Sequence, residues 1–263
     1  MKHELRLFFV ALQFYTRLPI PAWVGCHESA LNPATRYLPL IGWLVGAVTG
    51  LVWLAGTYLI DADTGLLLGM TASVLLTGAF HEDGFADVCD GFGGGWTKER
   101  ILTIMKDSRV GTYGVVGLVL IIGLKFSLLH GLSVRLLAEP ALLFAALTSA
   151  HALSRFMAAT FIRTHTYVRE TPDSKVKPVA QTIGPGVLVV AGVWAAVPLL
   201  AMVWFTQQPL LLLLVPVLYG VKMALARYFT RWIGGYTGDC LGATQQVCEV
   251  SFYLFTTLFW KFT

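Results

Sequence analysis

Charged residues and paired cysteines are scarce in this sequence, and each scarcity argues against a class of protein. Only 13% of the 263 residues are charged, whereas 56% are hydrophobic, a balance that soluble domains rarely show. The four cysteines contain no CxxC pair, which argues against a cysteine-ligated zinc site and a disulfide framework. No polar stretch is long enough to form a separate soluble domain. We therefore expect a single membrane-embedded domain over residues 1–263.

Apolar segments that could cross a bilayer recur along the chain. We predict about seven spans, at residues 37–60, 65–80, 110–129, 140–162, 183–205, 210–228 and 247–262. The first residues follow a different pattern, because Lys2, Arg6, Gln13 and Arg17 share one helical face. This pattern predicts an amphipathic helix at the membrane interface. The predicted fold class is an all-α, polytopic helical bundle with this N-terminal interfacial helix.

The basic residues predict the orientation of the bundle. Fourteen of the 19 Lys and Arg residues fall in four segments, at residues 1–36, 81–109, 163–182 and 227–246. The connections on the opposite side contain only Arg135, and the C-terminal tail adds Lys261. Because cytoplasmic segments carry the excess of basic residues, the four segments are predicted to face the cytoplasm.

One stretch, residues 81–114, is far denser in acid, glycine and base than the rest of the chain. Asp83, Asp87 and Asp90 are four and then three residues apart, so a helix would present them on one face. Three carboxylates there repel each other unless a cation binds among them, and such oxygen ligands suit Mg²⁺, Mn²⁺ or Ca²⁺. Glu82 points about 100° away and is a weaker metal-ligand candidate. The alternative is a solvated acidic turn.

Basic residues follow the acids within the same stretch. Lys106 and Arg109 are three apart and can converge on one anion, with Asp107 and Ser108 between them. A guanidinium binds phosphate through two parallel hydrogen bonds, so we expect these four residues to contact substrate. The alternative is that the two bases only anchor the helix at the membrane surface. Metal-binding acids followed by phosphate-binding bases indicate chemistry on a phosphate or diphosphate.

Further candidates lie outside this stretch. Arg155 falls inside a predicted span, four residues after His151, and could reach an anion or form a salt bridge within the bundle. Arg169, in a basic polar loop, could hold an anionic substrate or only signal topology. Asp239 is a lone acid between glycines, as a catalytic carboxylate or a helix N-cap would be. Glu249, in the last predicted span, could also enter the site.

With these residues identified, the sequence resembles the cobalamin synthase family, the adenosylcobinamide-GDP ribazoletransferases, along nearly its whole length. The main matching motifs are ALQFYTRLP, HEDGFADVCDG, MKDSRVGTYG and GGYTGDCLGA. The resemblance implies a Mg²⁺-dependent enzyme of the bacterial inner membrane that joins adenosylcobinamide-GDP to α-ribazole or its 5′-phosphate and releases GMP. It implies these substrates and the lipid bilayer as partners and no nucleic acid, and it leaves open a homo-oligomer.

Under this hypothesis Mg²⁺ held by the three aspartates bridges the diphosphate, and the basic residues neutralise its remaining charge. A hydroxyl of the ribazole attacks the phosphorus attached to cobinamide, and Asp90 or Asp239 accepts its proton. A looser likeness to CDP-alcohol phosphotransferases begins at Asp83, but Asp87 stands where their signature has arginine. A cation-coupled transporter or channel is a further alternative, which predicts acids at mid-membrane and paired repeats.

Overall fold

The computed structural model describes residues 2–25, 28–168 and 182–262, and this part of the chain is almost entirely helical. Its α-helices are α1 (Lys2–Tyr15), α2 (Leu31–Ala34), α3 (Leu38–Leu59), α4 (Ala62–Thr77), α5 (Phe80–Gly94), α6 (Lys98–Ile104), α7 (Thr112–Ala138), α8 (Pro140–Thr164), α9 (Pro185–Thr206), α10 (Leu214–Ile233) and α11 (Gly238–Phe262). The short 3₁₀ helices are η1 (Ala22–Val24), η2 (Glu28–Ala30), η3 (Thr35–Tyr37) and η4 (Pro209–Leu213). The all-α fold class is confirmed.

The number of membrane spans differs from the prediction. Among the described residues, five helical segments are long and apolar enough to cross a membrane, namely α2–α3, α7, α8, α9 and η4–α10. The bent pair α4 and α5 adds at most a sixth. The predicted seventh span lies within α11. The first half of α11 carries polar side chains, such as Gln245 and Glu249, which are buried inside the bundle. The multi-pass membrane architecture is confirmed, with five or six candidate spans among the described residues where the sequence predicted about seven.

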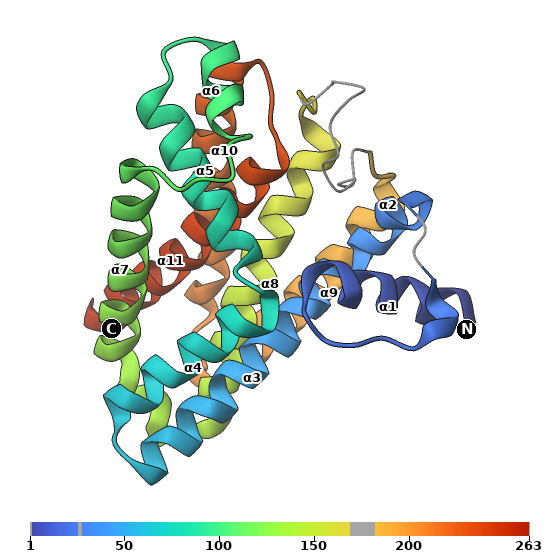
Figure 1. Cartoon of the computed structure of the whole chain (residues 1–263). Coiled ribbons are helices and arrows are strands. Elements are labelled where there is room, and N and C mark those ends of the chain that lie inside the picture. The colour runs from blue at the N-terminus through green and yellow to red at the C-terminus, as the bar shows by residue number, and fades with distance from the viewer. Residues whose placement is uncertain (1, 26–27, 169–181, 263) are drawn as a thin grey trace.

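Helix α8 runs through the middle of the bundle (Figure 1), and its side chains are buried along most of its length. Helix α3 packs on α8 through glycines, so the two backbones come close together. A Cβ atom added at Gly42 would lie 2.6 Å from the carbonyl oxygen of His151. Helix α1 buries Leu7, Ala11 and Tyr15 in an apolar cluster with the start of α3, as its amphipathic pattern predicts.

A sharp break separates α4 from α5. Gly78 and Ala79 both have positive φ angles, of 66° and 57°, which end α4 and turn the chain before α5 begins. The two helices meet at 87°. In Figure 1 the α3–α4 turn and helix α6 lie at opposite ends of the molecule, and α5 leads from the break towards α6. The acidic stretch is therefore a helix that starts inside the bundle, where the topology prediction had a loop from residue 81.

Candidate active site

The three predicted metal ligands all lie on α5, but their surroundings differ. Asp83 is exposed, Asp87 is half-buried and Asp90 is buried. The spacing of four and three residues does place them along one helix, as the sequence predicts. What each carboxylate can do depends on the helices packed around α5, which are mainly α11 and α7.

Asp90 caps the N-terminus of α7. One of its carboxylate oxygens accepts a hydrogen bond from the backbone N–H of Gly111 at 2.7 Å, and the other accepts from that of Gly114 at 2.8 Å. These N–H groups have no partner within α7, and the negative charge is favourable at a helix N-terminus. A Cβ atom on either glycine would collide with this carboxylate. Asp90 thus fastens α7 to α5.

Glu82 points away from the aspartates and into the bundle. Its Oε1 atom accepts a hydrogen bond from the side-chain amide of Gln246 on α11 at 3.0 Å. Its Oε2 atom is buried and has no hydrogen-bond partner among the described residues. In the same part of the chain, no three His, Cys, Asp or Glu side chains gather closely enough to hold a metal ion. The predicted set of Asp83, Asp87, Asp90 and Glu82 is therefore not assembled.

Asp239, near the start of α11, approaches α5 directly. A Cβ atom added at Gly84 would lie 3.0 Å from the Cα and the carbonyl oxygen of Asp239, so the absence of a side chain at Gly84 lets the two helices come close together. The hydroxyl of Thr237 donates to the Asp239 carboxylate at 3.3 Å. The crossing brings an acid from a distant part of the sequence beside the helix that carries Asp83 and Asp87.

The chain after α8 pairs with the chain before α11. The Tyr236 N–H donates to the carbonyl oxygen of Thr166, and the Val168 N–H donates to that of Tyr236, each at 3.0 Å. This short ladder holds residues 166–168 beside the chain that enters α11. Arg169, predicted to bind substrate, lies outside the described residues.

The predicted phosphate-binding segment forms the exposed connection between α6 and α7. Arg109 donates to both carboxylate oxygens of Asp107, from Nε at 3.0 Å and from Nη2 at 2.7 Å. These hydrogen bonds lower the pKa of Asp107 to about 2. The pair is therefore intact at neutral pH and is lost only as the pH falls through that value. Lys106 and Ser108 are also exposed, so all four predicted residues are accessible to a large substrate.

Arg155 lies deeper than the sequence predicted. Its side chain is almost fully buried on α8, and Nη1 donates to the carbonyl oxygen of His151 at 3.0 Å. Its Nε atom has no hydrogen-bond partner among the described residues. Arg155, Tyr15 and His81 line a cavity of about 30 Å³, roughly the volume of one water molecule. In this structure Arg155 therefore organises the interior beneath the site and does not face a large substrate.

Two further charged residues belong to this interior, and sequence reasoning gave them no firm role. Lys125 on α7 forms a 2.9 Å ion pair with Glu249 on α11, and His151 lies 3.3 Å from the same carboxylate. Lys125 also donates to the side-chain oxygen of Gln246. The signal in the sequence was the presence of ionisable residues in apolar helices, which are usually paired. Lys125, His151 and Glu249 thus join α7, α8 and α11 through one buried polar cluster.

Comparison with known proteins gives a consistent result over almost the whole chain. The model of the cobalamin-5-phosphate synthase family matches residues 7–257. Similar proteins named adenosylcobinamide-GDP ribazoletransferase include one from Shewanella piezotolerans, 45% identical over 96% of this chain and 95% of the relative. Another, from Shewanella amazonensis, is 44% identical over 99% of this chain and 98% of the relative. No solved structure matches the chain.

Proposed function

Because the chain belongs to the cobalamin-5-phosphate synthase family, we propose that it is an adenosylcobinamide-GDP ribazoletransferase. It transfers the cobinamide phosphate of adenosylcobinamide-GDP to α-ribazole or its 5′-phosphate and releases GMP. The observation that carries this proposal is the near full-length similarity to relatives of that name. The gathering of acids and bases at one end of the bundle supports it, because a diphosphate substrate needs both.

The reaction is a displacement at phosphorus. A hydroxyl oxygen of the ribazole forms a bond to the phosphorus attached to cobinamide, and the bond from that phosphorus to the oxygen of GMP breaks. The hydroxyl proton passes to a carboxylate, and GMP leaves with the electron pair. The protein's tasks are to align the two substrates and to stabilise the charge that develops on the diphosphate oxygens.

Asp83 and Asp87, one turn apart on α5, are the carboxylates that we assign to a Mg²⁺ ion. Mg²⁺ is usually held by one or two carboxylates and completes its shell with water and substrate phosphates, so a ready-made cluster of three acids is not required. When bound, the ion would neutralise charge on the diphosphate. Asp90 and Glu82 are poor ligands here, because Asp90 binds the backbone of α7 and Glu82 faces Gln246.

Asp239 is the better candidate for the proton acceptor. Asp90, the other carboxylate considered, already accepts two backbone hydrogen bonds, one on each carboxylate oxygen, and so serves the N-terminus of α7. Asp239 is half-buried where α11 approaches Gly84 of α5, and the exposed Arg109 and Lys106 offer positive charge to the diphosphate. The excess of basic residues at this end supports a cytoplasmic site in a bacterial inner membrane.

Release of GMP by the purified protein tests the proposal. The protein in lipid nanodiscs is incubated with adenosylcobinamide-GDP, α-ribazole and Mg²⁺, and GMP is separated by chromatography. We expect GMP and adenosylcobalamin to form in equal amounts and only when both substrates are present. Omitting α-ribazole controls for simple hydrolysis. If a folded protein gives no product with either α-ribazole or its 5′-phosphate, the proposed activity is wrong.

A cation-coupled transporter is not favoured by the interior of the bundle. The buried Glu249 is the acid that such a mechanism would need, and it is already paired with Lys125 and His151. Because Lys125 already neutralises the Glu249 carboxylate, a transported cation would bind there only weakly. The GMP assay separates the two functions, because a transporter would release no GMP.

A further inference from the structure

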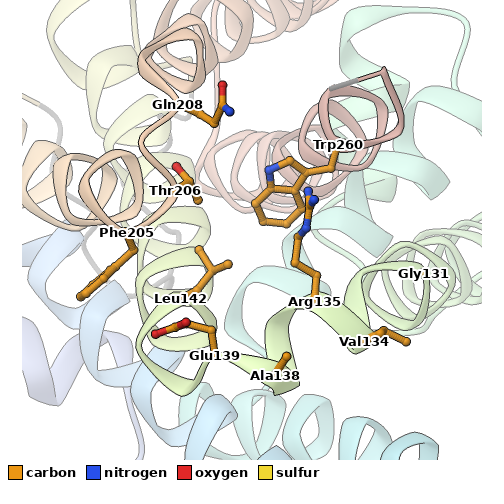
Figure 2. A pocket seen from close by; sticks show the side chains of 10 residues that line it. All are labelled: Gly131, Val134, Arg135, Ala138, Glu139, Leu142, Phe205, Thr206, Gln208 and Trp260. Carbon is orange, nitrogen blue, oxygen red and sulfur yellow. The ribbon is translucent and has the colours of Figure 1, made fainter.

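A second cavity lies far from the acidic helix. Its volume is about 640 Å³, and it is formed by the ends of α7, α9 and α11 and the start of α8 (Figure 2). Helix α7 has 27 residues, so its C-terminal end lies about 40 Å along the helix axis from the Asp90 cap. This is the end of the bundle where basic residues are rare. The cavity is open to the surface and large enough to hold solvent or a ligand.

The walls of the cavity are part apolar and part charged. Val134, Leu142 and Phe205 supply apolar surface, and Arg135 and Glu139 supply one charge of each sign. Phe205 and Val134 are exposed at the outer surface of the helices, where a bilayer would contact them. A site that combines apolar walls with both charges fits an amphiphile better than a water-soluble metabolite.

The two charges are held apart. The guanidinium of Arg135 lies over the ring of Trp260, 5.0 Å from its centroid, and Figure 2 shows the Glu139 carboxylate directed away from it. In the described part of the chain, neither charge takes part in an ion pair. The side-chain amide of Gln208 also lines the cavity. A ligand with a separated anion and cation could therefore satisfy both side chains at once.

We propose that this cavity binds the headgroup of a phospholipid that carries a phosphate and a primary ammonium, as phosphatidylethanolamine does. The phosphate would accept hydrogen bonds from Arg135 and Gln208, and the ammonium would donate to Glu139. Trp260 has the amphipathic ring that is typical of residues at the headgroup level of a membrane. A quaternary choline has no N–H group for Glu139, and a purely anionic headgroup would be repelled by it, so the ethanolamine class is selected.

Native mass spectrometry of the intact protein can measure this selectivity. The protein is exchanged into micelles containing equal amounts of phosphatidylethanolamine, phosphatidylcholine and phosphatidylglycerol with identical acyl chains, and retained lipid is counted. We expect the wild type to retain the ethanolamine lipid about tenfold better than the choline lipid, the size of one charge-assisted hydrogen bond. Glu139→Gln should remove that preference. Arg135→Gln should lower retention of all three lipids.

Lys261→Gln is the matched control, because Lys261 lies at the same end of the bundle but does not line the cavity. It should leave the retained lipid unchanged. Melting temperatures of all variants in the same detergent show whether each one is folded. If Arg135→Gln does not fold, the wild type and Glu139→Gln decide the result. Equal retention of the ethanolamine and choline lipids by the wild type, or preferential retention of the anionic lipid, would overturn the proposal.

Discussion

At the scale of single residues, the surface pair of Arg109 and Asp107 shows how a guanidinium can be oriented for binding an anion. The guanidinium of Arg109 already forms two parallel hydrogen bonds to a carboxylate, which is the geometry that a phosphate would also use. A diphosphate bound at the α6–α7 connection would compete with Asp107 for the Nε and Nη2 donors of Arg109. The planar fork of the guanidinium, more than its charge, is then what matters to the substrate.

Arg109→Lys keeps the charge and removes the fork. We expect kcat/KM for adenosylcobinamide-GDP to fall by about ten- to a hundredfold, the value of one charge-assisted hydrogen bond in the transition state. Steady-state GMP release at matched protein levels measures the effect. Arg100→Lys, which alters an exposed arginine on the neighbouring α6, should be silent. A lysine variant at position 109 that is as active as the wild type would leave Arg109 with only a topological role.

Substitutions of Asp90 and Asp87 can distinguish a carboxylate that supports the fold from one that we propose as a Mg²⁺ ligand. Asp90→Asn replaces one acceptor oxygen by an amide that faces a backbone N–H, so we expect it to destabilise the fold by about 1–2 kcal/mol, as the loss of a helix cap does. Asp87→Asn should leave the melting temperature unchanged and raise the Mg²⁺ concentration needed for half-maximal activity. Thermal unfolding and Mg²⁺ titrations measure both. A stable Asp90→Asn protein with a weakened Mg²⁺ response would make Asp90 a ligand.

At the scale of elements, the polar first half of α11 is stabilised by partners on other helices. The Lys125–Glu249 pair is buried, and removing one partner leaves an uncompensated charge. We expect Lys125→Met or Glu249→Gln alone to cost about 3–5 kcal/mol in unfolding free energy, and the double variant to cost clearly less than the sum. Unfolding in a mixed-micelle denaturation series gives the coupling energy. Strictly additive losses would show that the two side chains do not interact.

The sequence predicted elements well where one apolar pattern decided them, and less well where contacts between distant segments decided them. Helices α3, α7, α8, α9 and α10 are long and apolar, so hydropathy alone located them. Helix α11 begins at Gly238, ahead of the predicted span at residues 247–262, because Gln245 looks unsuited to a span until its buried partners Ser154 and Glu249 are known. The acids of α5 were found by their spacing, but the capping role of Asp90 depends on where α7 begins in space, which spacing cannot show.

At the scale of the whole molecule, orientation in the membrane can be tested directly. In a background without the native cysteines, Asp63→Cys in the α3–α4 hairpin and Lys98→Cys on α6 lie at opposite ends of the bundle. We expect a membrane-impermeant thiol reagent added outside intact cells to label position 63 only, because the basic residues gather at the other end. Labelling of position 98 requires broken cells. Equal labelling of both positions in intact cells would contradict the orientation.

The break between α4 and α5 also bears on how the protein is made. Helix α4 has 16 residues and is about 24 Å long, which is short of the roughly 30 Å of a bilayer's hydrocarbon core. It continues into a helix that packs mainly against α11, which is synthesised much later in the chain. Until α11 has been synthesised, α5 therefore lacks the helix that it packs against most, and Glu82 lacks Gln246. The acidic helix can therefore reach its native packing only after α11 has entered the membrane, so we expect no GMP release from a nascent chain that lacks α11.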